Sequence, residues 1–197
     1  MAVILLVRHG VTDTIGRSLS GRTPGVHLND EGRRQAERLG EYLGRKNVAA
    51  IYASPMERAV ETAAPIAART GHSPLVRPRL NEMDFGAWSG LTFDELDALE
   101  QWRRFNVNRT GVRPPGGEHV IDVQERMIAE LEELRNRGPS EVVVVVGHAD
   151  PLKTVLSYYL GFSLELLSRI ELSPASMSEL FLDGWTSCVR SMNVTVY

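Results

Sequence analysis

Two short apolar runs constrain the fold of this chain more than any other feature. Residues 3–7 read Val-Ile-Leu-Leu-Val, and residues 142–146 are five consecutive valines. Continuous runs of this kind are typical of strands that are buried on both faces of a parallel sheet. The first run leads directly into Arg8 and His9, and the second leads to His148. Because ligands gather where parallel strands end at their carboxyl edge, the sequence places two imidazoles at the mouth of a candidate site.

The remaining hydrophobic patterns alternate between extended and helical segments. They predict strands over 3–7, 49–53, 75–77, 142–146, 178–182 and 188–196, and helices over 30–46, 56–69, 92–104, 118–137 and 149–160. The last two strands are joined through Gly184 and Trp185, a connection so short that the strands must run antiparallel. We therefore expect an α/β fold: a three-layer sandwich with a mostly parallel central sheet, an antiparallel edge strand and helices on both faces. No linker-like segment divides the chain, so we expect a single domain over residues 1–197.

The composition excludes several classes of protein. With 197 residues, of which 43% are hydrophobic, the chain can bury a sizeable core without disulfide bonds. Its net charge of −3 gives no general attraction to nucleic acids or membranes, and no apolar run is long enough to span a bilayer. Its one cysteine, Cys188, cannot form an internal disulfide, so we expect a reducing compartment and a cytoplasmic location.

One arginine stands where helix physics disfavours a cation. Arg58 lies in the first turn of the helix predicted after the second strand, near the positive end of the helix dipole. Helix N-termini bind phosphates, so an anion beside this turn would explain the residue. The alternative is a surface arginine that pairs with Glu57 or Glu61.

An acidic residue completes a candidate constellation. Glu82 lies in a segment, residues 81–90, that mixes acids, aromatic residues and glycines without a clear period and is therefore predicted to be a loop. The topology can bring it to the same sheet edge as His9 and His148, together with the arginines Arg8 and Arg58. Two imidazoles, two guanidiniums and one carboxyl group form a site for a dianion and for in-line chemistry on it.

Metal binding is the competing use of such side chains. None of the five histidines is paired at the spacing of a metal motif, and the single cysteine adds no ligand set. Arg8 and Arg58 would also repel a cation, and the chain contains no Gly-x-x-x-x-Gly-Lys sequence of a P-loop. We therefore expect neither a metal ion nor another cofactor.

Five segments carry a family resemblance. They are Arg8-His9-Gly10, Ser54-Pro55-x-x-Arg58-Ala59-x-x-Thr62-Ala63, Leu80-Asn81-Glu82-x-x-Phe85-Gly86-x-Trp88, Pro115-Gly116-Gly117-Glu118 and Gly147-His148. In this order the segments resemble the motifs of the histidine phosphatase superfamily, also called the phosphoglycerate mutase-like family. Arg-His-Gly alone is a weak signal, but the ordered set spans most of the chain and is highly specific.

The resemblance implies a covalent phosphohistidine and a role for each site residue. His9 attacks phosphorus as a neutral imidazole, Arg8, Arg58 and His148 bind the phosphoryl oxygens, and Glu82 protonates the leaving oxygen. His148 thus counts both as a catalytic and as a phosphate-binding residue. We expect the two arginines to keep His9 neutral, a backbone carbonyl to fix its tautomer, and bound phosphate to raise the pKa of Glu82.

The chain departs from the family pattern after its first motif. Many members have an asparagine that contacts phosphate where this chain has Ile15, so we expect the loop Ser20 to Thr23 to supply that contact or the contact to be missing. The alternative is that this polar loop is merely solvated. Asp150 also stands where glycine is more usual. The residues expected to bind substrate are Ser20, Gly21, Arg22, Thr23, Glu118 and Ala149.

Three functions are compatible with these residues. The first is a metal-independent phosphatase that hydrolyses a small phosphomonoester through a phosphohistidine; the second is a phosphoglycerate mutase-type isomerase; the third is a non-catalytic phosphate-binding protein. A mutase must keep water away from the phosphohistidine. Residues 88–118, expected to form a cap-like insertion over the site, are few, and the chain ends at Tyr197 after its last predicted strand, so we favour the phosphatase.

The expected partner follows from this choice. It is a small phosphorylated metabolite, and neither a nucleic acid nor a membrane is expected to bind. A homodimer is compatible with the sequence, which leaves the oligomeric state open.

Overall fold

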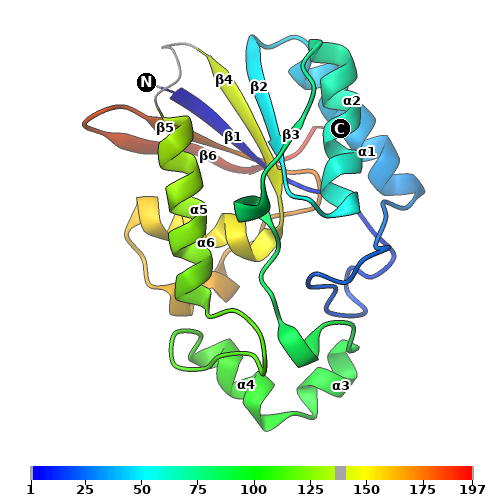
Figure 1. Cartoon of the computed structure of the whole chain (residues 1–197), viewed down its shortest axis with the longest axis vertical. Coiled ribbons are helices and arrows are strands. Elements are labelled where there is room, and N and C mark those ends of the chain that lie inside the picture. Colours follow the sequence, from blue (N-terminus) through cyan, green and yellow to red (C-terminus); the bar gives the residue numbers. More distant parts are fainter. Residues whose placement is uncertain (1, 136–140, 197) are drawn as a thin grey trace.

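The two apolar runs form neighbouring strands at the centre of a six-stranded sheet (Figure 1). The computed structural model describes residues 2–135 and 141–196. β1 (Ala2–Arg8) and β4 (Val142–Gly147) pair in parallel, with Arg8 opposite Gly147. Both strands therefore end at the same edge of the sheet, and His9 and His148 follow them there.

The rest of the sheet follows the predicted topology. The remaining strands are β2 (Val48–Ala53), β3 (Leu75–Val76), β5 (Met177–Leu182) and β6 (Ser187–Val194). The strand order is β3-β2-β4-β1-β5-β6; the pairs among β3, β2, β4 and β1 are parallel, and β5 pairs antiparallel with both β1 and β6. The predicted mixed α/β sandwich, mostly parallel with an antiparallel edge, is confirmed.

Helices cover both faces of the sheet. They are α1 (Asp30–Leu43), α2 (Glu57–Thr70), α3 (Phe93–Asp97), α4 (Glu100–Val107), α5 (Val120–Leu134) and α6 (Ala149–Leu160), with short 3-10 helices η1 (Pro78–Leu80), η2 (Gly86–Trp88) and η3 (Leu164–Arg169). Alternate residues of β1 point to opposite faces. Leu5 packs with the hydrophobic residues of α1 and α2, and Leu6 packs with those of α5 and α6 (Figure 1).

The helix predicted over 92–104 is wrong in one respect, because it is broken into α3 and α4. In a continuous helix, Leu96 and Phe105 would be nine residues apart and would lie on opposite faces. The break after Asp97 lets both side chains be fully buried in one core, and the indole of Trp102 donates a hydrogen bond back to the Asp97 carboxylate at 3.1 Å. Tertiary burial thus overrides the local helical pattern.

The helix predicted over 118–137 starts two residues later. His119 is the N-cap of α5, and Asp122 completes a capping box with it. Glu118 therefore remains in the preceding turn, where its N–H donates to the carbonyl of Asp84 at 2.8 Å. The last two residues of the predicted helix, 136 and 137, lie outside the described residues.

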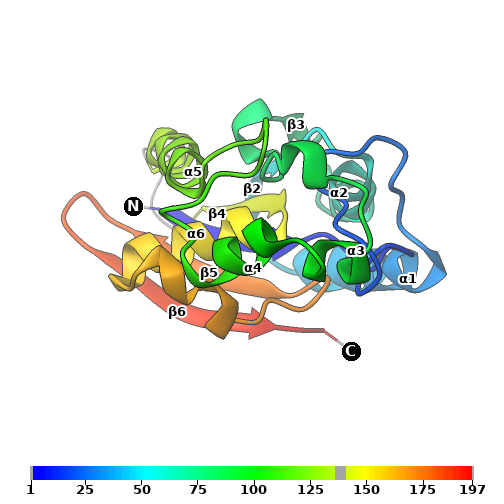
Figure 2. The same cartoon turned by 90° about the horizontal axis from the view of Figure 1, so that it is seen from below.

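The segment between η2 and α5 lies beyond the edge where β1 and β4 end. Figure 1 shows α3 and α4 past the ends of these strands, and Figure 2, seen from that side, shows them in front of the sheet. This arrangement leaves the strand ends facing side chains from α3 and α4. Within the described residues, no helix combines the length and the apolarity that crossing a bilayer requires.

Candidate active site

A pocket of about 330 Å³ opens where the strand ends face α3 and α4. Arg8, His9, Arg58 and Glu82 all line it, although they come from three separate parts of the chain. His148 lies beside it, with its ring centroid 5.2 Å from that of His9. The five residues expected to act on a phosphoryl group are thus brought together.

His9 is held as a neutral imidazole with one nitrogen free. Its Nδ1 lies 2.7 Å from the carbonyl oxygen of Gly10, so we assign the ring hydrogen to Nδ1 and leave the lone pair on Nε2. Burial, reinforced by the cations Arg58 and Arg8, lowers the pKa of His9 to about 3. The ring therefore stays uncharged at neutral pH.

The turn after His9 requires a glycine. The N–H of Gly10 donates to the hydroxyl of Thr62 on α2 at 3.0 Å. A Cβ at this position would lie 2.7 Å from the carbonyl oxygen of Gly32, closer than backbone atoms tolerate. The Arg-His-Gly motif thus packs against the starts of both α1 and α2, and this contact fixes the position of the imidazole.

The two arginines present unpaired donors to this space. Arg58 is 1% exposed and donates from Nη2 to the carbonyl of Gly21 at 2.8 Å, while Arg8 donates from Nη1 to the carbonyl of Leu172. Among the described residues, Nε and Nη1 of Arg58 and Nε of Arg8 have no hydrogen-bond partner. Burial lowers the pKa of both guanidiniums. A buried cation with free donors is costly unless an anion joins it, so the geometry suits an oxyanion.

The alternative position of Arg58, on the surface and paired with a neighbouring glutamate, does not occur. Glu57 accepts the N–H of Gly25 at 3.0 Å, and Glu61 accepts the N–H of Leu28 at 2.8 Å. Both acids therefore fasten the loop before α1 to α2 and leave Arg58 to the pocket.

His148 is oriented by a serine from the neighbouring strand. Its Nε2 lies 2.7 Å from the hydroxyl oxygen of Ser54, which also accepts the N–H of Met56 at 3.3 Å. The hydroxyl hydrogen is then free to point at Nε2, so we assign the ring hydrogen of His148 to Nδ1. This Nδ1 has no hydrogen-bond partner among the described residues and lies 3.8 Å from Oε2 of Glu82. Burial, reinforced by Arg58, keeps the pKa of His148 well below its ordinary value.

The pKa of Glu82 lies near neutral pH, so both of its protonation states are populated there. Burial raises its pKa to about 7, and the negative charge of Asp150 acts in the same direction. The neighbouring Arg58 opposes this shift, and Oε1 accepts the N–H of Met83 at 2.8 Å. The sequence argument assigned the raised pKa to bound phosphate, whereas burial already raises it in the protein by itself.

The loop after the first motif forms one wall of the pocket. Ile15, Ser20 and Gly21 line the pocket, and the hydroxyl of Ser20 lies 2.7 Å from that of Thr14. The side chain of Ile15 is apolar and offers no hydrogen bond to an anion. The idea that the Ser20 to Thr23 loop replaces the missing asparagine contact stays a prediction.

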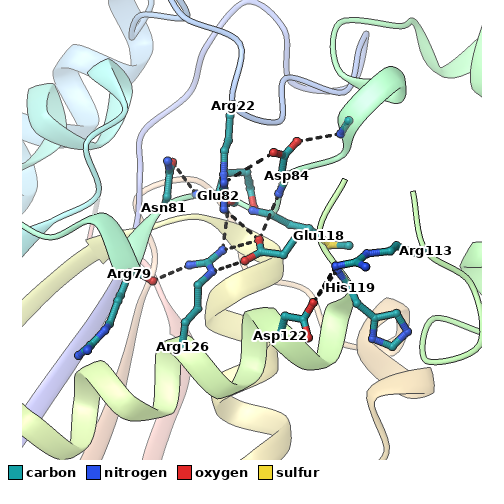
Figure 3. A network of polar contacts seen from close by, with 12 residues as sticks. Arg22, Arg79, Asn81, Glu82, Asp84, Arg113, Glu118, His119, Asp122 and Arg126 are labelled. Atoms are coloured by element: carbon teal, nitrogen blue, oxygen red, sulfur yellow. Dashed lines mark hydrogen bonds and ion pairs between the residues drawn. The ribbon is translucent and has the colours of Figure 1, made fainter. Parts of the chain in front are cut away.

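Three residues expected to bind substrate lie elsewhere. Among the described residues the pocket lining includes Ser20, Gly21 and Ala149, but not Arg22, Thr23 or Glu118. The N–H of Thr23 donates to the carbonyl of Ser20 at 2.9 Å and closes a turn. Arg22 and Glu118 bind each other at 2.9 Å on the backbone side of Glu82 (Figure 3).

The sequence argument missed several side chains that line the pocket. Phe93, Trp102, Asn106 and Arg109 reach it from α3, α4 and the following turn. Their places depend on the break between α3 and α4, for which the local pattern gives no signal. Arg109 belongs to the polar segment 106–117, and nothing in the sequence distinguishes it from its exposed neighbours.

Arg109 is paired with the acid that replaces glycine in the last motif. Its Nη1 lies 3.2 Å from Oδ2 of Asp150, and its guanidinium also stacks over the ring of Phe105 at 4.9 Å. Burial alone would raise the pKa of Asp150, but Arg109 and Lys153 hold it below its ordinary value. Asp150 is thus a carboxylate at neutral pH, within electrostatic reach of Glu82.

The donor set of this pocket does not resemble a metal centre. In residues 2–135 and 141–196, no three side chains of His, Cys, Asp or Glu come together in a way that could hold a metal ion. The two guanidiniums that gather at the strand ends carry N–H donors, which bind anions, and their positive charge opposes a metal cation.

Comparison with known proteins gives a consistent match over nearly the whole chain. The sequence profile of the histidine phosphatase superfamily (branch 1) matches residues 4–195. The bifunctional protein Rv2228c of Mycobacterium tuberculosis is 38% identical over 98% of this chain, but the match covers only 54% of that relative. The chain thus spans about half the length of the curated relatives that match it at this level.

Other relatives match along their full length. Phosphoserine phosphatase 1 of Hydrogenobacter thermophilus is 30% identical over 100% of this chain and 94% of its own. The solved structure of Bacillus stearothermophilus YhfR superposes with a TM-score of 0.90 at 29% identity, covering 98% of this chain and 97% of that chain. A mycobacterial glucosyl-3-phosphoglycerate phosphatase, Rv2419c, superposes with a TM-score of 0.88 at 26% identity, covering 98% and 99%.

Proposed function

The chain belongs to the histidine phosphatase superfamily (branch 1), and on that premise we propose that it is a metal-independent phosphatase that hydrolyses a small phosphomonoester through a phosphohistidine intermediate. One observation carries the proposal. Neutral His9 lines the same pocket as Arg8 and Arg58, two cations that carry buried donors without partners, so a nucleophile and an anion site share one space.

In the first proposed step, Nε2 of His9 attacks phosphorus, an N–P bond forms and the ester O–P bond breaks. Protonated Glu82 gives its proton to the leaving oxygen, so the alcohol departs as a neutral molecule. A pKa of about 7, raised by burial, supports this role because a large fraction of Glu82 carries the proton at neutral pH.

The transition state places charge on three equatorial oxygens, and this chain has cations and donors for them. Arg8, Arg58 and the Nδ1–H of His148 are proposed to bind these oxygens. Phosphoryl transfer depends mainly on positioning and electrostatic stabilisation. In this proposal the preorganised donors stabilise the negative charge on these oxygens, as a metal ion does in other enzymes.

In the second proposed step, water releases the enzyme. The carboxylate of Glu82 takes a proton from water while the water oxygen attacks phosphorus. The N–P bond breaks and its electron pair returns to Nε2 of His9. Inorganic phosphate leaves, and both residues regain their starting protonation states.

The pocket supports a small substrate. Its volume of about 330 Å³ suits a metabolite, and we propose that residues 88–118 form the cap-like insertion over it. Arg109 and Asp150 offer one charge of each sign to the substrate. Two relatives are named as a phosphoserine phosphatase and a glucosyl-3-phosphoglycerate phosphatase, which supports a small phosphorylated metabolite.

We also propose a cytoplasmic location. Cys188 is exposed and unpaired, as is usual in a reducing compartment.

The proposal is tested by turnover and by trapping. The protein is expected to hydrolyse para-nitrophenyl phosphate in excess chelator, and alkali quenching is expected to trap labelled phosphate on His9. The His9→Ala variant should lose turnover and label together. Undiminished labelling of that variant would exclude His9 as the nucleophile.

Two further outcomes distinguish the alternative functions. Phosphate binding without turnover between about pH 5 and 8, where His9 is neutral, would indicate a non-catalytic binding protein. Isomerisation of 3-phosphoglycerate in the presence of 2,3-bisphosphoglycerate, well ahead of phosphate release, would indicate a mutase. A screen of phosphorylated metabolites then identifies the substrate.

A further inference from the structure

Two arginines from distant segments bind the backbone of the proposed acid. Nε of Arg22, in the loop after β1, donates to the carbonyl oxygen of Glu82 at 2.7 Å. Nη2 of Arg126, on α5, donates to the same oxygen at 3.2 Å. Figure 3 shows Arg22 and Arg126 reaching the segment of Glu82 from opposite sides.

Glu118 joins the two arginines. Its Oε1 accepts Nε of Arg126 at 2.7 Å, and its Oε2 accepts Nη2 of Arg126 at 3.0 Å and Nη2 of Arg22 at 2.9 Å. Two guanidiniums that share one carbonyl oxygen repel each other unless an anion lies between them. The carboxylate of Glu118, only 17% exposed, supplies that anion.

The same network holds the residues on both sides of Glu82. Oε2 of Glu118 accepts the N–H of Asp84 at 3.3 Å, and Nη1 of Arg126 donates to the carbonyl of Arg79 (Figure 3). The segment from Asn81 to Phe85 lies between η1 and η2 and belongs to no helix or strand. Side chains therefore make most of the hydrogen bonds to its backbone. Most of these side chains are Glu118 itself or the two arginines that Glu118 binds.

We propose that Glu118, acting through Arg22 and Arg126, positions Glu82 for proton transfer to the leaving group. Glu118 does not belong to the described pocket lining and is a positioning residue, not a catalytic one. This inference rests on the proposed function, in which Glu82 is the general acid. A general acid must lie within hydrogen-bond reach of the leaving oxygen, and a misplacement of about 1 Å can cost a hundredfold in rate.

The test compares two substrates of nearly equal shape. Phenyl phosphate has a basic leaving group that needs protonation, whereas para-nitrophenyl phosphate needs little. Because both substrates share the later hydrolysis of the phosphohistidine, the test uses kcat/KM, which covers only the steps up to release of the leaving group. Glu118→Gln is expected to lower kcat/KM for phenyl phosphate by about 10-fold to 100-fold, and kcat/KM for para-nitrophenyl phosphate by less than about threefold. A role that is only structural would lower both rates equally, and that result would overturn the inference.

The matched control is Glu31→Gln. Glu31 on α1 is also bound by two arginines, Arg34 at 2.9 Å and Arg38 at 2.8 Å, but among the described contacts neither arginine binds the segment of Glu82. Its substitution should change neither rate. If Glu118→Gln does not fold, Arg22→Lys carries the test, because one ammonium cannot bind the carbonyl and Glu118 with the geometry of a guanidinium.

A double variant separates this inference from the proposed function. If Glu118 acts only through Glu82, the Glu82→Gln/Glu118→Gln protein should hydrolyse phenyl phosphate no more slowly than Glu82→Gln alone. Additive losses would overturn the positioning role and leave the acid assignment standing. If Glu82→Gln itself lowers kcat/KM for both substrates equally, the acid assignment fails, and the positioning role fails with it.

Discussion

The ring centroids of His9 and His148 lie 5.2 Å apart, yet the two rings are held by different kinds of partner. His9 donates its Nδ1–H to the carbonyl of Gly10, which leaves the lone pair on Nε2. His148 accepts the hydroxyl hydrogen of Ser54 at Nε2, which leaves the N–H on Nδ1. In the proposed mechanism two identical side chains thus take the roles of nucleophile and donor, and the difference comes from one backbone carbonyl and one hydroxyl.

Ser54 is accordingly expected to matter for rate. Ser54→Ala removes the donor that keeps the hydrogen of His148 on Nδ1, so kcat for para-nitrophenyl phosphate should fall about tenfold, equivalent to about 1.4 kcal/mol of transition-state stabilisation. Steady-state kinetics measure this. Ser157→Ala is the control, because Ser157 on α6 is also buried but donates to the carbonyl of Phe162, just past the end of that helix. An unchanged kcat in Ser54→Ala would contradict the tautomer assignment.

The pH dependence should report Glu82. Its pKa of about 7 is raised by burial, and the acid must be protonated, so kcat/KM for phenyl phosphate should fall above about pH 7. Dividing this profile by that for para-nitrophenyl phosphate removes the ionisation of the phosphate group, which both substrates share. Glu82→Gln should flatten the ratio. His9, with a pKa of about 3, stays neutral throughout this range.

Asp150 should set the pH at which the ratio of kcat/KM for phenyl phosphate to kcat/KM for para-nitrophenyl phosphate begins to fall. Its negative charge raises the pKa of Glu82, so Asp150→Asn should lower that pKa and move the decline in the same ratio by about one pH unit toward acid. The unpaired charge of Arg109 left behind acts in the same direction. Asp183→Asn, at the exposed hairpin between β5 and β6, is expected to leave the profile in place. A decline that does not move in Asp150→Asn would show that the two carboxyl groups are not coupled.

Arg58 should reduce stability while it supports phosphate binding. The side chain is 1% exposed with two unpaired nitrogens, so Arg58→Met, which replaces a buried charge by an apolar chain, should unfold at an equal or higher denaturant concentration than the natural protein. Inorganic phosphate should raise the unfolding midpoint of the natural protein but not of the variant. A variant that is much less stable, or is still stabilised by phosphate, would contradict this role.

The sequence predicted the centre of this site well because its signals are local. The buried runs before His9 and His148 identify two parallel strands, and their carboxyl edge follows from topology alone. The proline-led helix start that carries Arg58 is equally local. The same reasoning placed the loop of Glu82 at this edge, although without its backbone contacts.

The periphery of the site was not predictable in the same way. Arg22 and Glu118 were expected to bind substrate, yet they meet each other across 96 positions of the chain, for which no local pattern exists. Arg109 and Asp150 meet only because the chain breaks between α3 and α4, and that break reflects burial of Leu96 and Phe105 and not helix propensity. Long-range pairs of charged residues require the folded structure.

The backbone that carries the proposed nucleophile, His9, is held differently from the backbone that carries the proposed acid, Glu82. β1, which leads into His9, is paired along both sides, so its amide hydrogens are expected to exchange with solvent only when the whole domain opens. The segment of Glu82 lacks strand partners; Met83 and Phe85 anchor it in the core, and side chains bind much of its backbone. Substitutions among those contacts can therefore retune the proton donor for leaving groups of different basicity while the sheet that holds His9 stays intact. Laboratory evolution toward new substrates should collect its changes around Glu82 and not around His9.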